Sequence, residues 1–196
     1  IGQRQGNDCQ VTIKLLERRD KLEGVIMKNI VIYAPYQAVS MSLMLIKDLC
    51  WVAAGIAGDR ANDDAQGYGG VTIIDKSGSK VDCFNGSEVS SNGTIKSTTQ
   101  PDVVFIAAFW GSAEDALQHH PELLPWLRQL HDDACPIVAI SNATYFLAQA
   151  GLLENKVATL YSPYEKDFRQ RYPNVLLRPE RAITNADGLY CANAIP

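Results

Sequence analysis

Ser141 is the residue whose surroundings point most clearly to chemistry. It follows the apolar run 137–140 and precedes a helical pattern, and Ala139 and Ala143 place small side chains on either side of it. A sharp strand-to-helix turn strains its central residue and points that side chain outward as a nucleophile, while the N–H groups of the helix can hold an anion. Both alanines stand where such an elbow usually has glycine. The alternative is that Ser141 simply caps the helix that follows.

The histidines are the candidate bases for a serine nucleophile, because histidine most often accepts the proton of the hydroxyl. The chain has three, His119, His120 and His131, and all of them precede the serine. The order His120-Pro121-Glu122 predicts the start of a helix with exposed imidazoles. No second cluster of ligand residues accompanies these histidines, so we expect neither a metal site nor a cofactor.

The five cysteines are odd in number, widely spaced and without a CxxC pair: Cys9, Cys50, Cys83, Cys135 and Cys191. This distribution argues against a disulfide framework and against a thiolate zinc site, and it favours a reducing cytoplasm. Cys135 lies between an alanine and a proline at the start of an apolar strand, where a buried and unreactive thiol is expected. No role is predicted for Cys191.

These residues belong to a chain in which short apolar runs alternate with amphipathic stretches of helix length, a pattern that predicts a parallel sheet flanked by helices. The predicted strands are Ile30–Ala34, Val71–Asp75, Val103–Ala108, Ile137–Ser141 and Val157–Tyr161. The third and fourth do not alternate with polar residues, so they should lie in the centre of the sheet. The predicted helices are Ser42–Ala57, Pro121–Asp133, Asn142–Leu153 and Glu165–Tyr172. Residues 76–100 should form a hairpin with strands at Lys80–Phe84 and Gly93–Lys96.

Composition and charge limit the class of protein. The chain has 196 residues, of which 46% are hydrophobic and 20% charged, as in a globular α/β domain. Its 18 basic and 22 acidic residues give a net charge of -4, which argues against a chain that binds nucleic acid by itself. No apolar run is long enough for a membrane helix. Residues 1–26 give no clear periodicity, so we treat them as an extension of unassigned role and residues 27–196 as one domain.

The segment 140–159 resembles the central signature of the class I glutamine-amidotransferase-like (ThiJ/PfpI-type) superfamily. In the branch fused to transcription regulators of the AraC type, the elbow is followed by a Leu-Ala-x-Ala-Gly-Leu-Leu block and an Ala-Thr pair, which stand here at Leu147–Leu153 and at 158–159. Further matches lie at 101–106, 126–128, 171–175 and 183–186, so the resemblance spans about residues 28 to 195. It implies a three-layer flavodoxin-like sandwich, with a mostly parallel sheet, helices on both faces and the elbow at Ser141.

The resemblance also implies that the catalytic positions of the superfamily have changed in this chain. The cysteine nucleophile falls on Ser141, and the histidine that follows the Ala-Thr pair falls on Tyr161 or Leu160. The acidic residue of the loop after the first strand falls within 39–42, where this chain has no carboxylate. The resemblance therefore implies a binding domain without catalytic residues.

We accordingly expect a cytoplasmic effector-sensing and homodimerising domain of an AraC-type regulator, with DNA bound by a helix-turn-helix domain after residue 196. Open α/β sheets bind ligands over the carboxyl ends of their strands. The residues expected to line that crevice are Tyr36, Ser40, Trp110, Gly111, Ser141, Asn142 and Tyr161. Their hydroxyl, amide and aromatic groups favour a polar small-molecule effector with an amine or a carboxylate. Two alternatives stay open, a serine-based amidase or hydratase of the superfamily and a chaperone-like relative.

Overall fold

The computed structural model describes residues 29–56 and 70–193. The predicted extension 1–26 and Ala57, the last residue of the first predicted helix, lie outside the described residues. In the described part, no helix is both long enough and apolar enough to cross a membrane.

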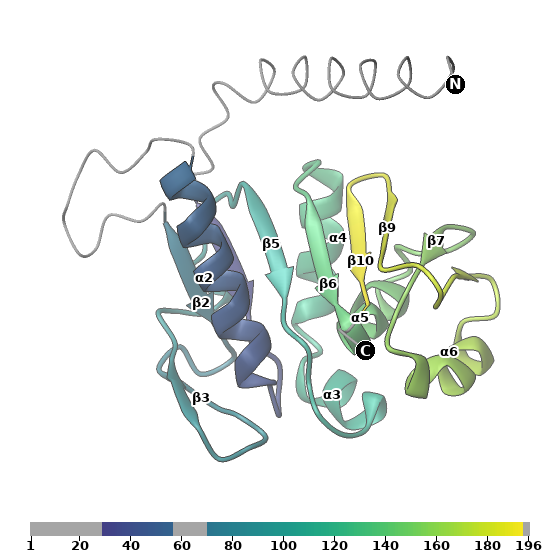
Figure 1. Ribbon diagram of the computed structural model, residues 1–196, viewed down its shortest axis with the longest axis horizontal. Coiled ribbons are helices and arrows are strands. Elements are labelled where there is room, and N and C mark those ends of the chain that lie inside the picture. Colours follow the sequence, from purple (N-terminus) through teal and green to yellow (C-terminus); the bar gives the residue numbers. More distant parts are fainter. Residues whose placement is uncertain (1–28, 57–69, 194–196) are drawn as a thin grey trace, which may run out of the picture.

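A six-stranded sheet forms the centre of the molecule, in the order β2-β1-β5-β6-β10-β9 (Figure 1). Its strands are β1 (Ile30–Tyr33), β2 (Val71–Ile74), β5 (Val103–Ile106), β6 (Ile137–Ile140), β9 (Ile183–Ala186) and β10 (Leu189–Ala192). Neighbouring strands run parallel except β9, which pairs antiparallel with β10 at one edge. The first four predicted strands are confirmed, and so is the central place of β5 and β6, because uninterrupted apolar runs can be buried on both faces of a sheet.

Helices cover both faces of this sheet, so the predicted three-layer α/β architecture is confirmed (Figure 1). On one face, Leu43 of α2 packs in a core with Ile32 of β1. On the other face, the neighbouring strand residue Val31 joins a second core with α3, α4 and α5. Successive side chains of β1 therefore enter opposite cores, as the pleat of a strand requires. The bounds of these helices are Ser40–Ile56 (α2), Ala113–His119 (α3), Leu123–Asp132 (α4) and Thr144–Gln149 (α5).

Two of the predicted strands differ from the structure. Of the predicted strand Val157–Tyr161, only β7 (Val157–Ala158) forms a paired strand, and it pairs with β8 (Leu176–Leu177) outside the central sheet. The predicted hairpin exists as β3 (Lys80–Asp82) and β4 (Glu88–Ser90), but its second strand was wrongly expected at 93–96. That segment leads into a 3-10 turn at 95–97, because the Ser97 hydroxyl accepts a hydrogen bond from the Thr94 N–H at 2.9 Å and holds the chain in a local turn.

The helix after Ser141 is shorter than predicted. A 3-10 turn at Ser141–Ala143 leads into α5, which ends before Gly151. This glycine has φ +79°, and the Leu152 N–H donates to the Leu147 carbonyl at 3.0 Å, a common way to close a helix. The predicted helix before Pro173 is confirmed as α6 (Glu165–Arg171). The predictions did not include α3, β9 or β10.

Candidate functional site

A cavity of about 600 Å3 lies beside the carboxyl ends of β5, β6 and β10, where open α/β sheets bind ligands. The residues that follow β5 and β6 form its inner wall, and α2 forms the opposite wall. Phe84, from the turn between β3 and β4, and Trp110, from the loop after β5, stand at its rim with their rings stacked at 5.1 Å between centroids. The cavity is thus assembled from segments far apart in the sequence.

Ser141 forms the strained turn that the sequence predicts. Its φ is +58°, in the left-handed region that side chains other than glycine rarely adopt, and its side chain lines the cavity. The Thr144 hydroxyl lies 3.0 Å from both the Ser141 carbonyl and the Thr159 carbonyl and shares its one proton between them, which ties the turn to the segment after β7. The alternative that Ser141 is the N-cap is wrong, because the N-cap positions are Ile140 for the 3-10 turn and Ala143 for α5.

Asn142 connects the elbow to the loop after β5. Its side chain is only 1% exposed. Its Oδ1 accepts from the Phe109 N–H at 3.2 Å, and its Nδ2 donates to the Phe109 carbonyl at 2.8 Å. Because both polar atoms are engaged by one backbone residue, Asn142 holds the wall of the cavity rather than offering a free amide to a ligand.

Tyr161 and Leu160 are the two positions where the resemblance places the histidine of the superfamily, and of these Tyr161 lines the cavity together with Ser141. Tyr161 is 39% exposed, and its ring lies 6.4 Å from that of Tyr164. In the loop where an acid would stand, the Ser42 hydroxyl donates to the Val39 carbonyl at 2.8 Å and accepts from the Ala108 N–H at 3.2 Å. Within the described residues, the lining of the cavity includes neither a histidine nor a carboxylate.

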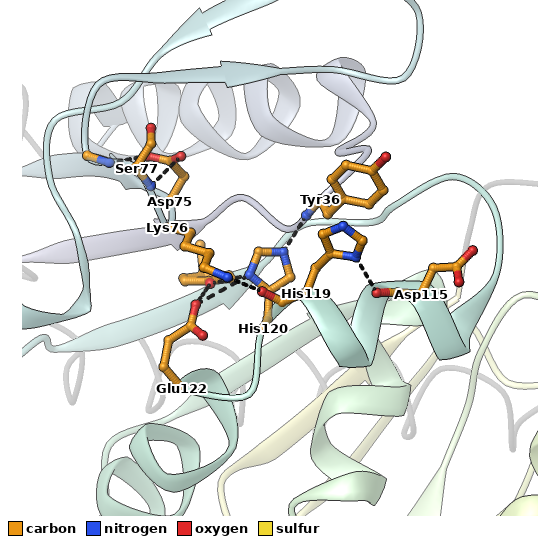
Figure 2. Close-up of polar contacts among 10 residues, drawn as sticks. Tyr36, Asp75, Lys76, Ser77, Asp115, His119, His120 and Glu122 are labelled. Atoms are coloured by element: carbon orange, nitrogen blue, oxygen red, sulfur yellow. Dashed lines mark hydrogen bonds and ion pairs between the residues drawn. The ribbon is translucent and has the colours of Figure 1, made fainter.

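His120 corrects one prediction from the sequence. The imidazole is not exposed at a helix start but is 3% exposed, between Tyr33 of β1 and the backbone of Tyr36 (Figure 2). Burial lowers the pKa of His120, although the Glu122 carboxylate acts against that shift. His119 is exposed as expected and stacks on the Tyr36 ring at 3.9 Å.

Comparison with known proteins identifies the family. The family model described as DJ-1/PfpI matches residues 60–191, which is more than half of the chain. The chain belongs to the DJ-1/PfpI family. The ThiJ/PfpI-type resemblance found in the sequence is thereby confirmed.

The relatives of this DJ-1/PfpI domain include regulators. Over 108 residues it is 29% identical to the HTH-type transcriptional regulator CdhR of Pseudomonas aeruginosa, a match that spans 55% of this chain and 31% of that protein. Among solved structures, a protein of Vibrio parahaemolyticus assigned as a transcriptional regulator superposes with TM-score 0.72 at 22% identity, covering 84% of this chain and 82% of its own. An AraC family transcriptional regulator of Pseudomonas putida gives TM-score 0.65 at 18% identity, covering 84% and 82%. At these identities the two structures share the fold.

The DJ-1/PfpI domain does not bring all seven expected residues into one crevice. Ser141, Asn142, Trp110 and Tyr161 line the cavity. Tyr36 and Gly111 instead line a separate recess of about 240 Å3, which also touches Trp110. Ser40 lines neither of these two spaces, and its hydroxyl accepts from Asn85 Nδ2 at 3.1 Å. Proximity in the sequence to the end of a strand was therefore not enough to place a residue in the cavity.

The sequence analysis missed the apolar part of the cavity. Met41, Leu45 and Leu49 of α2 line it, and Phe84 closes one side. The spacing of four residues along α2 was the signal that could have found this apolar face. The lining is therefore far less polar than the expected set of hydroxyls and amides.

The cysteines and acidic groups of the domain form no further reactive centre in the described part of the chain. No group of three or more His, Cys, Asp or Glu residues suited to a metal ion occurs at 29–56 or 70–193. Cys135 is partly rather than fully buried, and burial raises the pKa of its thiol to about 11. Burial also raises the pKa of the Cys191 thiol to about 11, and this residue is fully enclosed. Such thiols are poor nucleophiles near neutral pH, and Cys9 lies outside the described residues.

Proposed function

We propose that this domain senses a small-molecule effector for a transcription regulator of the AraC type and does not catalyse a reaction. The observation that carries the proposal is the strained elbow at Ser141, which opens on a cavity of ligand size with no histidine or carboxylate in its described lining. A serine hydroxyl needs a base to become a nucleophile. Kinship with proteins named as regulators supports the same proposal.

We expect the effector to have an apolar body. The Asn142, Ser42 and Tyr164 side chains already make hydrogen bonds within the protein, to the backbone of Phe109, Val39 and Gly111 respectively. The Ser141 hydroxyl makes no hydrogen bond within the described residues and faces the cavity as a polar contact. A charged amine or carboxylate, as first expected, would lose hydration here without an ionic partner in the described lining. One neutral polar group near Ser141 fits better.

The proposal includes homodimerisation and DNA binding by a separate domain. Trp51 and Val52 of α2 lie outside the lining of the cavity and leave apolar side chains exposed to solvent, which supports coverage by a second copy. The net charge of -4 supports DNA contact through another part of the regulator. Since the match to CdhR spans only 31% of that protein, the activity of a whole regulator is part of the proposal. The proposal also includes a cytoplasmic location, where such a regulator would reach DNA.

A thermal-shift screen with a cavity-filling variant tests the sensor. Neutral aromatic and aliphatic amides and alcohols are compared with amines and carboxylates. A ligand at 100 times its Kd stabilises the folded state by about 2.7 kcal/mol, a rise in Tm of about 5–10 °C for a domain of this size. Leu45→Trp should abolish the rise because Leu45 lines the cavity. Lys47→Trp should keep it, since two residues further along a helix lie about 200° around its axis.

The outcome also separates the alternatives. Stabilisation that persists in Leu45→Trp would place binding elsewhere and refute the sensor cavity. Turnover of any tested amide that disappears in Ser141→Ala would establish an enzyme instead. Sedimentation analysis tests the dimer: the wild-type domain should be a dimer at micromolar concentration and Val52→Lys a monomer, and a monomeric wild type would contradict dimerisation.

A further inference from the structure

His120 lies beside the loop after β1 (Figure 2), and that loop reaches the cavity at Val39. Its Nδ1 lies 2.7 Å from the hydroxyl of Tyr33 on β1, and its Nε2 lies 2.6 Å from the backbone N of Tyr36 in the loop between β1 and α2, residues 34–39. Its ring meets the edge of the Phe146 ring of α5 at 6.1 Å between centroids. The imidazole thus bridges the sheet, the loop and the helices of one face.

These contacts define the protonation state of His120. A backbone N–H can only donate, so Nε2 must be the unprotonated acceptor of the Tyr36 N–H. Nδ1 then carries the single proton and donates to the Tyr33 hydroxyl, which in turn donates to Glu122 Oε1 at 3.3 Å. The chain of hydrogen bonds is complete only while the imidazole is neutral.

The loop that His120 holds is itself bonded to the walls of the cavity. The Trp110 N–H donates to the Gln37 carbonyl at 2.9 Å, and the Val39 N–H donates to the Ala108 carbonyl at 2.8 Å. The Phe84 N–H donates to the Ala38 carbonyl at 3.2 Å. Gln37 has φ +57°, a strained conformation that persists only when its surroundings fix it. A displacement of the loop would therefore move Trp110 and Phe84, the two rings at the rim.

We propose that neutral His120 positions the loop 34–39 against the cavity, and that protonation of its Nε2 releases this loop and weakens ligand binding. The second half rests on the proposed function, because it requires the cavity to hold a ligand. An added proton on Nε2 would face the Tyr36 N–H donor to donor, and one of the two must move.

Charged groups from several elements surround His120 and determine where it titrates. Glu122, before α4, lies 3.5 Å from Nδ1 and favours the imidazolium. Lys76, which donates to the His119 carbonyl at 2.9 Å, and the His119 ring both disfavour it. Asp75, directly after β2, contributes to raising the pKa of the Tyr33 hydroxyl. Burial, the largest influence, lowers the pKa of His120, so its protonation is expected below the ordinary histidine value of about 6.5.

Backbone amide resonances test the positioning without any ligand. In the uniformly 15N-labelled domain, the Tyr36 and Trp110 amide shifts should titrate with one midpoint below about pH 6.5. The variant His120→Gln should abolish this titration, because a glutamine Oε1 can accept the Tyr36 N–H and does not titrate. The variants His119→Gln and His131→Gln serve as matched controls and should keep it. Persistence of the titration in His120→Gln, or its absence from the wild type between pH 7.5 and 4.5, would overturn the inference.

Binding of the uncharged fluorescent dye Nile red tests the effect on the cavity. Wild-type affinity should fall about fivefold between pH 7.5 and a pH well below the midpoint of the amide titration, the loss expected for one hydrogen bond. We expect His120→Gln to bind equally at both pH values, and His120→Phe, which keeps a ring but loses the acceptor, to bind weakly at both. A wild-type affinity that does not change while the amides titrate would refute the coupling to binding.

The two experiments separate this inference from the proposed function. Dye that does not bind the wild type at pH 7.5, or binds equally to Leu45→Trp, would count against the sensor cavity. The amide titration would still decide whether His120 positions the loop. If His120→Phe fails to fold, the comparison of wild type with His120→Gln alone carries both tests.

Discussion

Replacing Asn142 with alanine would remove the link between the elbow and the loop after β5. The side chain is 1% exposed and makes two hydrogen bonds, at 3.2 and 2.8 Å, with the backbone of Phe109. Alanine would leave the N–H and the carbonyl of Phe109 without these partners. A neutral hydrogen bond contributes about 1 kcal/mol net, and an unpaired buried group costs about 1–3 kcal/mol. We therefore expect Asn142→Ala to lower the free energy of unfolding by about 2–4 kcal/mol.

Urea denaturation followed by fluorescence measures this loss, and a thermal scan should show Tm lower by about 5–15 °C for a domain of this size. Asn174→Ala is the matched control. Asn174 is exposed, and its Nδ2 donates to Glu154 at 2.6 Å on the surface. Since exposed polar pairs contribute little, this variant should lose less than about 0.5 kcal/mol.

The substitution Asn142→Asp provides a sharper test because it keeps the shape of the side chain. An aspartate can still accept from the Phe109 N–H, but when ionised it faces the Phe109 carbonyl with no proton to donate. Burial raises the pKa of the introduced carboxyl above its unfolded value of about 3.9, so the variant should lose stability as pH rises above that value and regain it in acid. If Asn142→Ala costs no more than Asn174→Ala, or if the deficit of Asn142→Asp does not change with pH, the argument from this amide is refuted.

Three further substitutions test the elbow and the helix α6 by the same unfolding measurement. The free energy of unfolding of Ser141→Gly should stay within about 1 kcal/mol of the wild-type value. That of Ser141→Val should be lower by about 2 kcal/mol or more, because a branched side chain disfavours φ +58°. Equal stability of the two variants would contradict backbone strain at Ser141. Tyr145→Phe removes a hydroxyl that donates to Asp167 at 2.7 Å and should cost about 1 kcal/mol at neutral pH. Hydrogen bonds from Tyr145 and Arg171 lower the pKa of Asp167, so the stability that ionised Asp167 contributes is present above about pH 4 and is lost in acid. The loss of stability in Tyr145→Phe should therefore be smaller in acid than at neutral pH. A loss of stability that is larger in acid would argue against this account.

The parts of the fold that the sequence predicted correctly are those governed by local patterns. The apolar runs of β1, β2, β5 and β6 predicted a buried parallel sheet, because only a strand covered on both faces can hold such runs. The strand β9 was missed because its sequence Ile-Thr-Asn-Ala is half polar, and it is stable only through pairing with β10 at an edge. The strand expected at Val157–Tyr161 failed for the reverse reason: its apolar residues pack in a core without joining the central sheet.

The candidate site likewise has one feature that local sequence patterns predicted and one that they did not. The strain at Ser141 was predictable, because an apolar strand, a small neighbour and a helix occur within a few residues of one another. The burial of His120 was not, because its partners Tyr33 and Tyr36 lie 87 and 84 residues away in the sequence. A histidine before a proline has the same local pattern whether its side chain lies in solvent or between a strand and a loop.

The sequence by itself therefore determined the layered α/β architecture of this DJ-1/PfpI domain and the strained elbow at Ser141. Only the tertiary structure decided what surrounds that elbow: an apolar wall from α2, an asparagine engaged by the Phe109 backbone, and a neutral histidine that holds the neighbouring loop. The physical reason is that periodicity and turn signals act between residues close along the chain. The character of a cavity depends instead on side chains that packing brings together from distant segments.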